Sequence, residues 1–191
     1  MDPFTADRYT ARRKVFTIFG AQFHLWDERG QLVAFVQQRA FKLKEDIRVY
    51  ADESATRELL LIQARSIVDF SAAYDVVDAQ TGSRLGMLRR RGVSSLVRDT
   101  WEILGAGGEP IGALREDSMG LALVRRLLGN LVPQRFGVEV HGQPVGTLRQ
   151  RFNPFVHTFD VDFSNDHARL LPRALGLAAA ILLLAIEGRQ G

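Results

Sequence analysis

The 191-residue sequence contains no cysteine, which excludes a disulfide framework, a thiolate metal site and a cysteine nucleophile. The four histidines, His24, His141, His157 and His167, show neither an HExxH motif nor a short paired spacing on a helix. There is no Walker loop and no nucleophile elbow, and the glycine-rich stretch at 105–108 lacks the third glycine of a dinucleotide-binding loop. We therefore predict that the protein is not an enzyme and uses no cofactor and no metal.

Long hydrophobic runs are scarce, and the exception lies near the end of the sequence. Every residue from Ala174 to Ile186 is apolar or glycine, while Pro172 suits a first helical position and Gly188 suits a helix stop. A helix over about 172–187 would be roughly 24 Å long, shorter than a membrane span of about 20 apolar residues. We predict a helix buried inside the protein, with a transmembrane tail as the alternative. The first residues lack the apolar core of a secretory signal, so we expect the protein in the cytoplasm.

A short motif recurs four times, at 30–37, 82–89, 108–115 and 142–149. Each copy has a turn glycine, two residues, an aliphatic residue, a small residue, one more residue, an aliphatic residue, and Arg or Gln. Glycine permits the positive φ of a tight turn, and the alternation that follows is typical of a strand, so each copy predicts a β-hairpin. Strand parity places two positions inside and one outside. The inward small residues are Ala34, Gly86, Gly112 and Gly146, the inward aliphatic residues are Val36, Leu88, Leu114 and Leu148, and the outward residues are Gln37, Arg89, Arg115 and Arg149.

The remaining pattern is mostly that of strands. β-branched and aromatic residues mark strand-like segments over 14–39, 41–51, 58–69 and 72–90, and two short helices are predicted at 93–97 and 119–128. We predict a flexible N-terminus over 1–13 and a single mainly β domain over 14–191. This domain is a closed antiparallel barrel around the buried C-terminal helix, and the small inward residues leave room for the helix backbone.

Arginine dominates the basic residues, since only Lys14, Lys42 and Lys44 are lysines. The segments 83–98 and 118–138 each contain several arginines and no Asp or Glu. Guanidinium groups suit phosphate, so these segments predict a surface for anionic lipid headgroups, with nucleic acid as the alternative ligand. The predicted site residues are Arg89, Arg90, Arg91, Arg98, Arg125 and Arg126.

Five segments resemble the LURP-one-related proteins, which belong with phospholipid scramblases and tubby C-terminal domains in one superfamily; they are 41–52, 69–82, 88–104, 151–164 and 175–190. The resemblance implies a tubby C-terminal-like barrel of about twelve strands around a hydrophobic C-terminal helix. In scramblase-like proteins an acidic stretch proposed to bind calcium precedes that helix, where this sequence has Asp160, Asp162 and Asp166. The alternation of Phe159, Val161 and Phe163 with acidic residues is that of an ordinary strand, so no metal site is predicted.

These observations predict a non-catalytic module that binds anionic phospholipid at a membrane surface. The arginines would make a peripheral contact with the membrane that weakens with salt. A scramblase-like protein that moves lipid, an intracellular scaffold and a nucleic-acid-binding protein are the alternatives.

Overall fold

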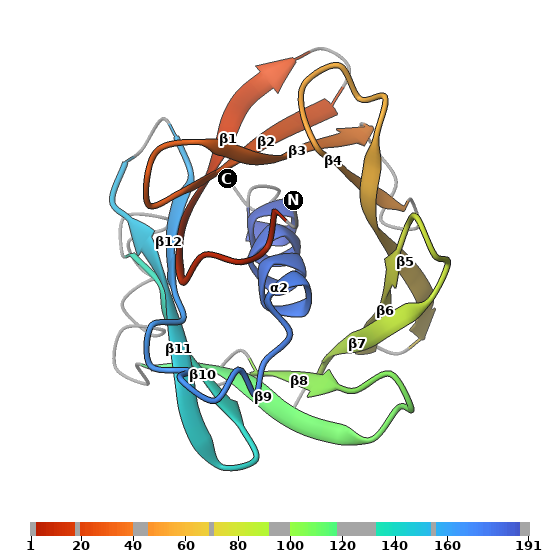
Figure 1. The fold of residues 1–191 in the computed structure, drawn as a ribbon, viewed down its shortest axis with the longest axis vertical. Helices are drawn as coiled ribbons and strands as arrows, with labels where there is room; N and C mark the ends of the chain where they lie inside the picture. The colour runs from red at the N-terminus through yellow and green to blue at the C-terminus, as the bar shows by residue number, and fades with distance from the viewer. Residues whose placement is uncertain are drawn as a thin grey trace.

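The structure is a computed structural model of the chain, and it describes residues 3–17, 20–39, 46–68, 71–91, 100–117, 133–153 and 156–187. The two helices predicted at 93–97 and 119–128 lie outside these ranges. Within them the chain forms twelve strands and one helix, arranged as a closed antiparallel barrel with the helix inside (Figure 1). The predicted fold class is confirmed.

The strands follow one another around the barrel in sequence order, each antiparallel to the next, and the first pairs with the last. This connectivity is an up-and-down barrel, which leaves no free sheet edge. The strands are β1 (Arg8–Thr17), β2 (Gly20–Asp27), β3 (Leu32–Arg39), β4 (Ile47–Tyr50), β5 (Glu58–Val68), β6 (Ser71–Asp78), β7 (Arg84–Arg90), β8 (Thr100–Leu104), β9 (Pro110–Glu116), β10 (Arg135–Val140), β11 (Gln143–Arg151) and β12 (Thr158–Asp162).

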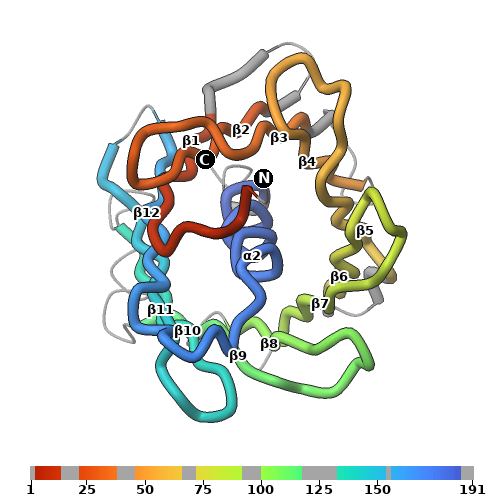
Figure 2. Tube along the Cα trace, viewed as in Figure 1, coloured from red at the N-terminus to blue at the C-terminus, as the bar shows by residue number. Residues whose placement is uncertain are grey.

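The helix α2 (Arg173–Glu187) lies along the middle of the barrel, as the tube view also shows (Figure 2). Its side chains from Leu177 to Ala185 are all buried, on every side of the helix. The barrel therefore surrounds the apolar run that the sequence places at 172–187. None of the described helices is long and apolar enough to cross a bilayer.

The hairpin motif has the predicted geometry. The turn glycines Gly30, Gly82, Gly108 and Gly142 have φ of 74°, 69°, 92° and 76°, in the left-handed region that glycine adopts without strain. The inward aliphatic residues are buried and the final Arg or Gln of each copy is exposed. The predicted parity is confirmed in all four copies.

Each copy also contains a β-bulge that the motif encodes. In the β6–β7 hairpin, Val76 pairs with Gly86 whereas Val77 pairs with Arg84, so Leu85 is an extra residue. The same shift leaves Val33, Ile111 and Val145 as extra residues in the other three hairpins, and β5 carries an equivalent extra residue, Leu59. Bulges increase strand twist and bend, which helps a sheet to close. They also place aliphatic residues near one end of the barrel.

The small inward residues have a more varied role than the sequence indicates. A Cβ at Gly86 would lie 2.8 Å from Leu175 Cδ2 of α2, so this glycine does make room for the helix. At Gly146 a Cβ would meet the Asp162 carbonyl and the Phe163 ring, each at 2.6 Å, and at Gly112 it would collide with the Glu139 backbone. These two glycines allow close approach of neighbouring chain segments rather than of α2.

The predicted flexible N-terminus over 1–13 needs a correction, because residues 8–13 form the first part of β1. Tyr9, Ala11 and Arg13 are buried in alternation and pair through their backbone with β2, and residues 8–12 also pair with β12. This strand closes the barrel, which explains why a polar-looking segment is ordered.

Candidate functional site

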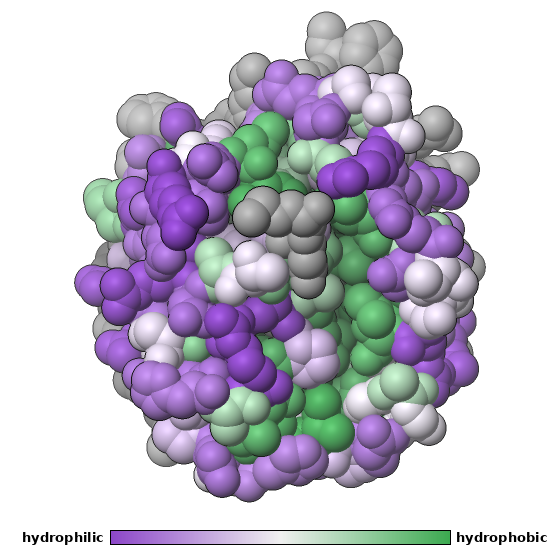
Figure 3. Space-filling model, in the orientation of Figure 1, coloured by the Kyte–Doolittle hydropathy of each residue, from purple (hydrophilic) through white to green (hydrophobic). Residues whose placement is uncertain are grey.

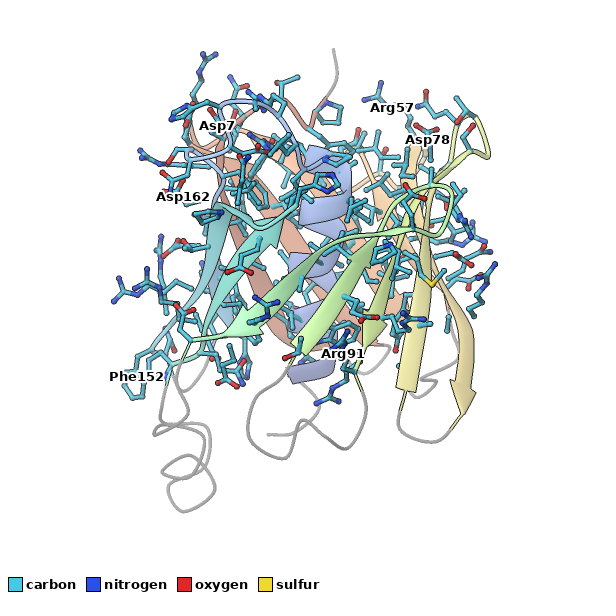
Figure 4. The ribbon with its side chains drawn as sticks, turned by 90° about the horizontal axis from the view of Figure 1, so that it is seen from below. Asp7, Arg57, Asp78, Arg91, Phe152 and Asp162 are labelled. Carbon is cyan, nitrogen blue, oxygen red and sulfur yellow. The ribbon has the colours of Figure 1, made fainter. Side chains whose placement is uncertain are left out.

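The barrel has two chemically different ends. The turn end carries the four glycine turns and the start of α2, with Arg57 and Asp78 near it; the arginine end carries Arg91 and Phe152 (Figure 4). Because every strand runs from one end to the other, the turns of successive hairpins lie together at one end of the barrel.

The structure brings Arg89 and Arg91 together on one carboxylate. Their Nε atoms donate to Glu102 of β8 at 2.8 and 2.6 Å, because β7 and β8 pair with Arg89 opposite Glu102. Burial raises the pKa of Glu102, but hydrogen bonds and charge from the two arginines outweigh this and lower it. The segment 83–98 has no acidic residue of its own, but Glu102 of the next strand lies against it and partly compensates its positive charge.

The other predicted site residues have different surroundings. Arg90 is half-buried on the inward side of β7, opposite the buried Trp101. Arg98, Arg125 and Arg126 lie outside the described residues. The structure thus places three of the six predicted arginines, and only two of these on the outer face.

Sequence reasoning missed Phe152, which follows β11 at the arginine end (Figure 4). It is 59% exposed, the single large hydrophobic side chain that is exposed in the described part of the chain. Arg151 and Arg149 are both exposed, and Arg151 is paired with Asp160. The available signal was an aromatic residue just beyond the last alternating residue of a strand.

The acidic residues before α2 do not form a calcium-type cluster. Asp160 accepts from Arg151 at 2.6 Å, Asp162 from Arg8 at 3.1 Å, and Asp166 from Arg173 at 2.7 Å. Each carboxylate has its own guanidinium and points to a different partner. Across the described ranges no group of three or more His, Asp or Glu side chains is arranged to hold a metal.

The histidines have different surroundings, of which three are informative. His24 Nε2 is 2.6 Å from Glu53 Oε1, and its ring stacks on Trp26 at 5.4 Å between centroids. His141 occupies a turn with φ of 50°. Burial and the Arg13 charge lower the pKa of His157, so this imidazole is disposed to stay neutral. The prediction that the protein is not an enzyme stays a prediction.

A cavity of about 780 Å³ opens at the turn end. In the view of Figure 3, which looks onto this end, hydrophobic surface is visible inside the mouth and the surrounding rim is mostly hydrophilic. The bulge residues Leu59 and Leu85 contribute to its wall. Its apolar lining is Pro3, Phe4, Leu59, Leu60, Leu85, Leu171, Pro172 and Ala174, and its polar lining is Thr5, Arg57, Asp78, Gln80, Arg169 and Arg173.

A buried ion pair forms one wall of this cavity. Arg173, at the start of α2, donates to Asp166 Oδ2 at 2.7 Å and to Asp7 Oδ1 at 2.9 Å. The side chains of Arg173 and Asp166 are 4% and 0% exposed. Burial raises the pKa of Asp166, but hydrogen bonds from Arg173 and from the Leu171 and Leu170 N–H groups outweigh it and lower the pKa. We call Asp7, Asp166 and Arg173 the helix latch, because they join the N-terminal segment, the loop after β12 and the start of α2.

Comparisons with known proteins agree with this architecture. A family model described as LURP-one-related matches residues 32–168. The fold is similar to the X-ray structure of a protein from Arabidopsis thaliana, with a TM-score of 0.50 and 15% identity over 98% of this chain and 96% of that one. At this identity the likeness concerns the fold alone. No match was found among curated proteins.

Proposed function

The chain belongs to the LURP-one-related family, and from this premise we propose that it is a non-catalytic module that binds anionic phospholipid at a membrane surface through the arginine end of the barrel. The observation that carries the proposal is the exposed Phe152 at the same end as Arg91. Aromatic side chains are enriched at membrane–water interfaces, and basic residues beside them are attracted to anionic headgroups.

The charges at this end support weak, reversible binding. Each basic residue near an anionic surface contributes about 1 kcal/mol, and the attraction decays over about 8 Å at physiological salt. Glu102 offsets part of the charge of Arg89 and Arg91, to which it is hydrogen-bonded. Exposed Arg149, on the strand that leads to Phe152, adds a further positive charge.

Co-sedimentation of the purified full chain with neutral and phosphatidylserine-containing vesicles tests the proposal. We expect binding to anionic vesicles only, weakening as salt is raised. Phe152→Ser and the triple variant of Arg89, Arg90 and Arg91 to Ala should each reduce it. Glu102→Gln should strengthen it, because the charges of two arginines are then uncompensated.

Arg48→Ala is the matched control, since Arg48 is an exposed arginine of β4 that is paired with Glu58 of β5. It should bind vesicles like the wild type. Absence of binding to any vesicle would overturn the proposal, and salt-sensitive binding to nucleic acid without vesicle binding would replace it. Binding that requires calcium would instead favour a scramblase-like role and would direct attention to Asp160 and Asp162.

A further inference from the structure

We propose that the cavity at the turn end binds a single-chain lipid with a zwitterionic headgroup, a lysophospholipid, with its acyl chain against the apolar wall and its headgroup between Arg57 and Asp78. This site is at the opposite end of the barrel from the membrane contact proposed above (Figure 4). The inference goes beyond that contact and does not depend on it.

The size and lining of the cavity suit one acyl chain. Its volume of about 780 Å³ lies in the range of about 300–1,000 Å³ that is usual for small-molecule sites, which are mostly apolar with a few placed polar groups. Leu59 and Leu85, the extra residues of two bulges, and Leu171 supply aliphatic wall from three separate parts of the chain. A double-chain phospholipid is larger than this space.

Two opposite charges in the lining are available to a headgroup. Arg57 is exposed, and its guanidinium makes no hydrogen bond or ion pair within the described ranges, although its charge interacts with that of Asp52. Asp78 Oδ1 accepts from the Gln80 and Thr81 N–H groups at 2.9 and 2.8 Å, the Thr81 side chain also hydrogen-bonds this carboxylate, and no ion pair to it is found among the described residues. These are a phosphate-binding cation and an ammonium-binding anion.

The charge of Asp78 is held by its own turn. The Thr81 N–H bond lowers the pKa of this carboxyl most, burial opposes it, and the Gln80 N–H bond lowers it further, so Asp78 is ionised at neutral pH. A fatty acid would place its carboxylate near this fixed negative charge. A zwitterion places a positive group there instead, which is why the headgroup is assigned as zwitterionic.

The other two arginines of the lining are already engaged. Arg169 pairs with Asp7 at 3.2 Å and donates to the Thr5 carbonyl, while Arg173 belongs to the helix latch. They tie down the N-terminal segment, which runs in front of α2 in the view of Figure 1 and whose Phe4 and Thr5 line the cavity. Arg57 is therefore the lining cation that a ligand can bind without breaking a hydrogen bond or an ion pair among the described residues.

Isothermal titration of the full-length protein with 1-myristoyl-lysophosphatidylethanolamine, below its micelle concentration, tests this inference. We expect saturable binding by the wild type, with Arg57→Gln and Asp78→Asn each weakening it by about tenfold, the value of one charged hydrogen bond. Myristate, which lacks the ammonium group, and glycerophosphoethanolamine, which lacks the chain, should bind at least that much more weakly.

The β2–β3 hairpin offers matched controls. Asp27 Oδ1 also accepts two turn N–H groups, from Arg29 and Gln31, and neither Asp27 nor Arg29 lines the cavity. Asp27→Asn and Arg29→Gln should therefore bind like the wild type. Ala174→Phe and Leu85→Trp, each confirmed as folded by circular dichroism, should block binding by filling the cavity.

Three results would overturn the inference. The first is that the wild type does not bind the lysophospholipid, and the second is that myristate binds as tightly as the lysophospholipid does. The third is that Arg57→Gln and a folded cavity-filling variant both bind with wild-type affinity. The vesicle experiment gives an independent outcome, because Phe152→Ser should leave lysophospholipid affinity unchanged and Arg57→Gln should leave vesicle binding unchanged. Failure at one end can thus be told from failure at the other.

Discussion

Replacing Arg173 with Met should destabilise the protein strongly, because it breaks the helix latch from the side of its buried cation. The guanidinium bonds the carboxylates of Asp166 and Asp7 and lies over the Phe163 ring at 5.2 Å. Methionine keeps most of the length and apolar volume of the side chain, but it supplies no donor. Asp166, with a fully buried side chain, would lose its counter-charge.

The expected loss is about 3–5 kcal/mol in the free energy of unfolding, the usual cost of leaving one member of a buried pair uncompensated. The Leu170 and Leu171 N–H groups still bond Asp166, which favours the lower part of that range. For a chain of this size each kcal/mol lowers the melting temperature by about 2–4 °C, so a decrease of roughly 6–20 °C is expected.

Urea denaturation of the wild type, Arg173→Met, Asp166→Asn and the double variant would measure the coupling between the two residues. The double variant should lose less than the sum of the single changes, since neither partner is then left charged and unpaired. The pKa of Asp166 is lowered in the folded state, so the wild-type advantage is complete above the ordinary pKa of 3.8 and disappears as pH falls through the lowered folded value.

A loss below about 1 kcal/mol in Arg173→Met would refute this reasoning, because exposed ion pairs contribute that little. The same conclusion would follow if the stability difference from the wild type were independent of pH. Hydrogen exchange supplies a local readout: faster exchange at the start of α2 is expected in the variant, with β8 and β9 protected as before.

Three further substitutions test the barrel itself. Leu183→Asp puts an unpaired charge beside the barrel wall at a position 2% exposed, so it should yield no soluble folded protein, whereas Leu183→Met should; an Asp variant that melts like the wild type would contradict the buried helix. Gly86→Leu should cost roughly 1–3 kcal/mol or more in urea denaturation, because its side chain overlaps Leu175 and the Leu104 carbonyl; no change in midpoint would place Gly86 elsewhere. Gly142→Val should melt well below Gly142→Asn, since φ is 76° and asparagine tolerates it; equal melting temperatures would argue against the turn.

Much of the fold was predictable because its determinants are local. Turn glycines need only their own φ, and strand parity needs only alternation, so the repeat predicts the hairpins and the inward and outward faces. The all-apolar run at 174–186 must be enclosed by other parts of the protein, and together with the hairpins it predicts a barrel around α2. The bulges could also have been predicted from the sequence, since the extra residue occupies the same motif position in all four copies.

The candidate sites depended on pairs that lie far apart in sequence. Glu102 compensates Arg89 only because β7 and β8 pair in one particular register, and Asp7 reaches Arg173 across 166 residues only because β1 closes the barrel against β12.

Composition and periodicity by themselves determined that this chain forms hairpins around a buried helix, because turn conformation and side-chain alternation act between near neighbours. Barrel closure decided which charges are neutralised, where Phe152 is exposed and where Arg57 and Asp78 border an apolar cavity. These properties arise from strand register and from the position of α2 along the barrel, and both are set by the packing of the whole chain.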